Sequence, residues 1–89
     1  GAVSKECAAE MAKGIRLVSN SDISIISTGI AGPDGGTIDK PVGTVYLAFA
    51  DKNRVIVQKH HFDGNRYSVR HHATKAAFKL LYERIKELI

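Results

Sequence analysis

The sequence has no tryptophan, one cysteine and two prolines among its 89 residues. The single cysteine, Cys7, cannot form an internal disulfide, and it lacks the closely spaced cysteine or histidine of a zinc site, so we expect no metal. No apolar run approaches the roughly 18 residues that a membrane span requires. No basic leader followed by an apolar segment opens the chain either. We therefore expect a cytoplasmic protein that makes no contact with a membrane.

The excess of positive charge is small. Thirteen Lys and Arg residues against nine Asp and Glu give a net charge of +4, which favours anionic ligands without requiring nucleic acid. The three tyrosines, Tyr46, Tyr67 and Tyr82, do not line one strand face, so they do not make a stacking platform for bases. We therefore do not expect nucleic acid as the partner.

Two apolar patterns follow one another in the first third of the chain. Ser4 can cap a helix in which apolar residues recur every three or four positions. The apolar positions of this helix are Val3, Cys7, Ala8, Met11, Ile15 and Val18. Residues 23–27, ISIIS, then form a short β-branched run with apolar residues on both faces. Burial on both faces predicts a central strand covered by helices.

The rest of the chain predicts a hairpin and a long helix. Residues 43–50 and 54–62 are two strand-like runs separated by the polar turn DKN. Asp63 or Asn65 can then cap a final helix that runs to the C-terminus. One apolar stripe follows that helix, made of Val69, Ala73, Ala76, Ala77, Leu80, Leu81, Ile85 and Leu88. The order helix, strand, strand, strand, helix predicts one α/β unit, layered as an α/β/α sandwich and incomplete without further strands.

A glycine-rich segment, residues 27–45, lies between the first two strands and holds five of the eight glycines and both prolines. It is open to three interpretations. It can be a long connection, because glycines relieve backbone restrictions and Pro33 favours a turn. It can be a ligand loop, because backbone NH groups of such a segment can approach an anion closely. It can also contact a partner.

Arg66 lies at the start of the apolar stripe of the final helix, where a charged side chain requires a partner or access to solvent. It can pair with Asp34 or Asp63, extend to solvent, or hold an anion such as a phosphate together with the helix dipole. Arg70, one turn later, can assist in the last case. The adjacent pairs His60-His61 and His71-His72 cannot chelate a metal as a HxxxH motif does, so we expect them at the surface.

Four hydroxyl residues near the glycine-rich segment are candidates to contact a ligand. They are Ser27, Thr28, Thr37 and Thr44. None has a recognisable base beside it, and the GxSxG motif is absent. Thr28, on which the strand ends, is the hydroxyl that we expect nearest to a ligand.

Three segments, in order, resemble the C-terminal domain of the competence- and damage-inducible protein CinA. They are TGIAGPDGG (residues 28–36), KPVGTVYLAF (residues 40–49) and FDGNRYSVR (residues 62–70), and the opening GAVSKECAAEMAKGIR is similar to the family's preceding helix. The resemblance implies an α/β/α sandwich and, without any cofactor, hydrolysis of the carboxamide of nicotinamide mononucleotide in pyridine nucleotide salvage. It implies that Thr28, Gly29, Ala31, Gly32 and Arg66 contact the substrate.

The family's domain is longer than this chain. In its first half it carries a serine-containing segment, a tyrosine and a lysine to which the family's chemistry is ascribed, and this chain matches none of them, so we assign no catalytic residue. We expect residues 1–89 to be the C-terminal half of such a domain, completed by another copy or by a partner polypeptide. The alternative is a non-catalytic CinA-like binding or assembly module that oligomerises through its sheet edge.

Overall fold

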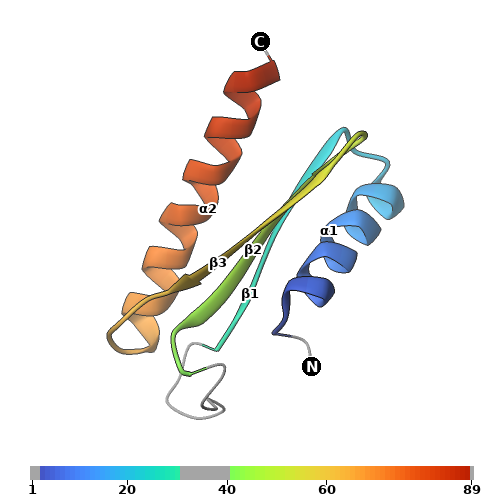
Figure 1. Ribbon diagram of the computed structural model, residues 1–89. Coiled ribbons are helices and arrows are strands. Elements are labelled where there is room, and N and C mark those ends of the chain that lie inside the picture. Colours follow the sequence, from blue (N-terminus) through green and yellow to red (C-terminus); the bar gives the residue numbers. More distant parts are fainter. Residues whose placement is uncertain (1–2, 31–40, 89) are drawn as a thin grey trace.

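The computed structural model describes residues 3–30 and 41–88, which form two helices and a three-stranded sheet (Figure 1). In chain order the elements are helix α1 (Lys5–Ser19), strands β1 (Ile23–Gly29), β2 (Thr44–Asp51) and β3 (Val55–His61), and helix α2 (Arg66–Leu88). The order is the one that the sequence predicts. In the described part of the chain, neither helix is long and apolar enough to cross a membrane.

The three strands form one antiparallel sheet in the order β1-β2-β3. The predicted hairpin of β2 and β3 is confirmed, and the Asp51 carboxylate accepts hydrogen bonds of 2.8 Å from the amides of Asn53 and Arg54 in its turn. The pKa of Asp51 is lower than its ordinary value. The main cause is the hydrogen bond from the Asn53 amide, and the hydrogen bonds and positive charge of Arg54 add to it. The turn is therefore fixed by one carboxylate.

The helices cover opposite faces of the sheet, which makes the predicted α/β/α layering (Figure 1). Side chains of β2 alternate between the two faces, because successive residues of a strand point in opposite directions. Tyr46, Ala48 and Ala50 pack against Ala8 and Ala12 of α1. On the other face, Val45, Leu47 and Phe49 pack against Val69, Ala73 and Leu80 of α2.

The prediction that residues 23–27 form the central strand is wrong for the sheet of this chain. The central strand is β2, which is buried along almost its whole length, and β1 is at an edge. The apolar pattern of β1 has another cause, since Ile26 packs on the α1 side while Ile25 packs on the α2 side. A strand between two helical layers is apolar on both faces even when one of its edges is free.

The structure confirms the predicted helix caps, but it does not confirm the predicted buried face of α1. The Cys7 amide donates to Ser4 Oγ at 3.1 Å, and the Ser68 amide donates to Asn65 Oδ1 at 2.9 Å, so Asn65 rather than Asp63 caps α2. In α1 the buried residues are Ala8 and Ala12. Three predicted core positions, Met11, Ile15 and Val18, are exposed. Small alanines let the helix lie close to the sheet, and the larger side chains stand to one side.

Candidate functional site

A groove of about 430 Å³ lies between the edge of β1 and the flank of α2. Its lining changes from polar to apolar along α2, from the first turn of the helix to its middle. The strand side is formed by Ile25, Ser27, Gly29 and, from β2, Val45, and the helix side by Arg66, Val69, Arg70, Ala73, Thr74, Ala77, Phe78 and Leu81. We call the part around Arg66, Arg70, Ser27 and Gly29 the polar end.

Two arginines dominate the charge of the polar end. Arg66 and Arg70 are both exposed, and among the described residues neither side chain takes part in an ion pair. Asp63, one of the two acids that the sequence offers as a partner of Arg66, lies instead 3.7 Å from Nδ1 of His61. The first turn of α2 contains no acidic residue. Two cations beside a helix N-terminus therefore face the groove without a described counter-charge.

Of the predicted substrate-binding residues, Gly29 and Arg66 border the same groove. Thr28 is on the opposite face of β1, because it lies directly across from Tyr46, which packs on the α1 side. Ala31 and Gly32 lie outside the described residues. The hydroxyl that borders the groove beside Gly29 is that of Ser27.

Ser27 could have been selected from the sequence by strand alternation. Ile23 and Ile25 pack on the α2 side, so Ser27 and Gly29 follow on the same side. Thr74 and Phe78 also line the groove and are not apparent from the sequence, because they lie outside the apolar stripe that predicts the buried face of α2.

Gly29 is at a position where backbone packing leaves no room for a side chain. A Cβ atom there would lie 2.8 Å from the Thr44 carbonyl oxygen and 2.8 Å from Cγ2 of Val45. The glycine therefore has a structural reason within the sheet. Its lack of a side chain also keeps the polar end of the groove open.

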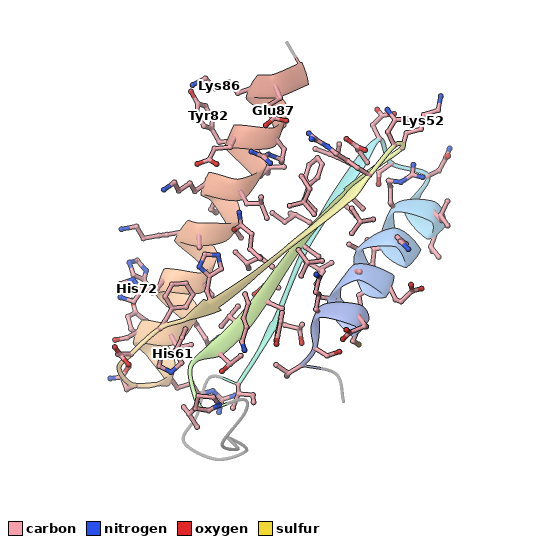
Figure 2. The ribbon with its side chains drawn as sticks, in the orientation of Figure 1. Lys52, His61, His72, Tyr82, Lys86 and Glu87 are labelled. Atoms are coloured by element: carbon pink, nitrogen blue, oxygen red, sulfur yellow. The ribbon has the colours of Figure 1, made fainter. Side chains whose placement is uncertain are left out.

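Backbone hydrogen bonds join the two ends of the glycine-rich segment. The Ile30 amide donates to the Thr44 carbonyl at 2.9 Å, and the Gly43 amide donates to the Ile30 carbonyl at 2.6 Å. The Phe62 amide in turn donates to the Gly43 carbonyl at 2.9 Å, and Nε2 of His61 donates to the Val42 carbonyl at 3.0 Å. These bonds place the two ends of the segment beside the end of β3, which leads into α2. Figure 2 shows His61 at this end of the sheet and Lys52 at the other end.

The histidines take part in a series of ring contacts between β3 and α2. The rings of His60 and Phe62 are 5.4 Å apart, those of Phe62 and His72 are 5.8 Å apart, and those of Tyr67 and His71 are 6.3 Å apart. Over the described ranges, no group of three or more His, Cys, Asp and Glu residues could hold a metal ion. The rings join the end of β3 to the first turns of α2.

Comparison with known proteins gives a consistent family. The sequence model of the CinA C-terminal domain matches residues 1–85. The chain is 52% identical over 86 residues to a CinA-like protein of Syntrophomonas wolfei, which covers 97% of this chain and 21% of the relative. It is 49% identical over 81 residues to a putative competence-damage inducible protein of Clostridium beijerinckii, covering 91% of this chain and 20% of that relative.

Solved structures show the same fold. The competence damage-inducible protein A of Klebsiella pneumoniae superposes with a TM-score of 0.89 at 34% identity, over 96% of this chain and 53% of its own. The competence/damage inducible protein CihA of Agrobacterium tumefaciens superposes with a TM-score of 0.87 at 36% identity, over 93% of this chain and 52% of its own. The chain thus spans about half of each solved structure and about a fifth of each curated relative.

Proposed function

The chain belongs to the CinA C-terminal domain family, and on that premise we propose that it forms part of a nicotinamide mononucleotide amidohydrolase. Its contribution is substrate binding, through the glycine-rich segment and Arg66. The proposal places the substrate at the polar end of the groove between β1 and α2, where Ser27, Gly29 and Arg70 lie beside Arg66.

The observation that carries this proposal is the pair of arginines without a described counter-charge. A nucleotide phosphate is an anion with several acceptor oxygens, and a guanidinium group can bind it through two parallel hydrogen bonds. The groove, at about 430 Å³, is within the range of about 300–1,000 Å³ that is usual for small-molecule sites. Its apolar lining beyond the arginines suits an aromatic ring.

Hydrolysis of a carboxamide also requires an activated nucleophile and groups that stabilise the developing oxyanion. Among the described residues, no histidine, lysine or carboxylate lines the groove, so Ser27 has no base there. The proposal therefore assigns binding to this chain and assigns the catalytic groups to residues outside it, in the part of the domain that this chain does not match.

The test of the proposal is the Michaelis constant of a reconstituted assembly. The purified chain would be combined with the part of the Klebsiella pneumoniae protein that the superposition leaves unmatched, and hydrolysis of nicotinamide mononucleotide would be followed by ammonia release. Arg66→Ala should raise KM by about tenfold or more, because a charge-assisted hydrogen bond contributes roughly 1.5–3 kcal/mol. Lys52→Ala removes the same charge at the far end of the sheet and should leave KM unchanged. Equal KM values for the two variants would contradict the proposal.

One observation favours a second candidate function. The free edge of β1 suits a CinA-like binding or assembly module that oligomerises through this strand without hydrolysing a substrate. Sedimentation equilibrium of the purified chain separates the two candidates. A stable homodimer that releases no ammonia, alone or in the mixture, would favour the module.

A further inference from the structure

We propose that the polar end of the groove is one half of a larger site, which holds a dinucleotide and stacks its second base on Tyr67 and His71. These two rings lie on the far side of Arg66 and Arg70 from the groove. The inference rests on the proposed function, because it keeps a nicotinamide nucleotide and its phosphate at the polar end. The dinucleotide binds there in competition with the mononucleotide.

A second hollow, of about 560 Å³, lies beside the first turns of α2. It is lined by Arg66, Tyr67, Arg70, His71 and Thr74, and most of its surface is apolar. Arg66, Arg70 and Thr74 also border the groove. The two arginines therefore lie at the boundary between two hollows, and a ligand that they hold can extend into both.

The order of the side chains around α2 explains why the arginines separate the two hollows. Val69 and Ala73 pack on the sheet. Because successive residues are about 100° apart around an α-helix, the two arginines come next around the helix, and Tyr67 and His71 follow them. The groove is thus on the sheet side of the arginines, and the second hollow is on the outer side of the helix.

Tyr67 and His71 provide flat surfaces in the second hollow. They are four residues apart, so their side chains are neighbours on the surface of the helix. The ring centroids are 6.3 Å apart, and the angle between the ring planes is 2°. Both side chains are exposed, Tyr67 to 78%. A planar base can stack on such rings whatever its identity, because every base has a π face.

The charge on this part of α2 suits a ligand with more than one phosphate. From Arg66 to Tyr82 the helix contains no acidic residue. Two guanidinium groups one helical turn apart can bind the oxygens of two linked phosphates. A mononucleotide supplies one phosphate and one ring, and it leaves the second hollow empty. A dinucleotide supplies two rings joined through two phosphates, which matches two hollows joined at two arginines.

The experiment titrates the purified chain with nicotinamide mononucleotide and with nicotinamide adenine dinucleotide, and follows the amide and ring signals by NMR. We expect the dinucleotide to bind at least about fivefold more tightly, because its second base gains a stacking surface. It should shift the ring signals of Tyr67 and His71, which the mononucleotide should leave nearly unchanged. Excess mononucleotide should displace the dinucleotide, since both require the same arginines.

Two substitutions of Tyr67 test the stacking surface. Tyr67→Ala should reduce the affinity for the dinucleotide to about that for the mononucleotide, and should leave the affinity for the mononucleotide unchanged within about twofold. Tyr67→Phe keeps a ring and should retain most of the gain. Because Tyr67 is exposed, neither substitution should unfold the chain. The comparison of the two nucleotides on the unmodified chain does not depend on either variant.

Tyr82→Ala is the matched control. Tyr82 is 66% exposed on the same helix, but it borders neither of these two hollows. It lies about 22 Å further along α2 than Tyr67, toward the C-terminal end (Figure 2). Its substitution should leave both affinities unchanged within about twofold. Equal losses for Tyr67→Ala and Tyr82→Ala would contradict the assigned surface.

The outcomes separate this inference from the proposed function. Equal affinities for the two nucleotides would overturn the second-base site alone, as would a gain that survives Tyr67→Ala or simultaneous binding of both nucleotides. In each of these cases, weaker mononucleotide binding by Arg66→Ala would still support the proposed function. If neither nucleotide binds, the proposed function is contradicted and the second-base site with it.

Discussion

At the scale of single residues, strand alternation decides which hydroxyl lies at the candidate site. Ser27 borders the groove with Arg66, while its neighbour Thr28 lies across from Tyr46 on the α1 side. The family resemblance implies that Thr28 contacts the substrate, but the strand pairing places its side chain on the face of the sheet opposite the groove. The two residues therefore make a discriminating pair for mutation.

Ser27→Ala should raise the KM of the reconstituted amidohydrolase for nicotinamide mononucleotide, since it removes a hydroxyl from the polar end of the groove. A lost neutral hydrogen bond amounts to about 0.5–1.5 kcal/mol, or roughly a threefold to tenfold rise. Thr28→Ala should change KM less, because its side chain is on the other face. Steady-state kinetics of the two variants checks this, and a larger effect at Thr28 would place the substrate away from the groove.

Gly29→Ala should destabilise the fold by about 1–3 kcal/mol, because the added Cβ would meet the Thr44 carbonyl oxygen and the Val45 side chain at 2.8 Å. Gly14→Ala is a matched control, since nothing lies within 4 Å of a Cβ atom at that helical position. It should stabilise the fold by about 0.5–1 kcal/mol. Urea unfolding of both variants measures the two shifts, and a neutral result at Gly29 would contradict the described packing.

At the scale of elements, the end of α2 is joined to the turn between β2 and β3 by charges. Nη2 of Arg54 is 2.7 Å from a carboxylate oxygen of Glu87, and Arg84 contacts the other oxygen of that carboxylate at 3.0 Å. The hydrogen bond from Arg54 lowers the pKa of Glu87, and Glu87 in turn raises the pKa of Arg54. Figure 2 shows Glu87 near the C-terminal end of α2.

The pH dependence of this contact has a definite sign. The lowered pKa of Glu87 means that its contribution to stability is complete above its ordinary value of 4.5 and is lost as the pH falls through the lower folded value. Glu87→Gln should therefore lower the urea midpoint at about pH 6 and make little difference at about pH 3. The effect should be small and should weaken with salt, because the pair is partly exposed.

Glu10→Gln is the control for that measurement, because among the described residues the Glu10 carboxylate forms one ion pair, with Lys13 at 3.6 Å, and its side chain is 76% exposed. It should show no comparable difference between the two pH values. A Glu87→Gln difference that grows toward acidic pH would contradict the assigned contact.

The elements themselves were predictable from the sequence, and their environment was less so. Periodicity, the capping residues Ser4 and Asn65, and the polar turn predict both helices and the hairpin. The position of β1 and the exposure of Met11 depend on which elements pack beside them, and the apolar pattern of one segment does not specify its neighbours. An apolar residue that packs within this chain cannot be distinguished, from the sequence alone, from one that packs against another polypeptide.

At the scale of the whole molecule, the described residues form a three-layered unit in which β1 is an edge strand beside the candidate groove. The edge of β1, the polar end of the groove and the exposed Phe78 of α2 lie along one side of this unit. Ligand sites are frequent at interfaces between domains, where each side can supply different groups. The proposed function, with substrate binding in this chain and catalytic groups outside it, requires the groove to lie at such an interface.

The central proposal is that this chain supplies substrate-binding residues to a nicotinamide mononucleotide amidohydrolase. The most direct test is the release of ammonia and nicotinic acid mononucleotide from nicotinamide mononucleotide. It would be measured for the purified chain, for the part of the Klebsiella pneumoniae protein that the superposition leaves unmatched, and for their mixture. We expect release in the mixture alone. A mixture that forms a stable complex in sedimentation but releases neither product would contradict the proposed function.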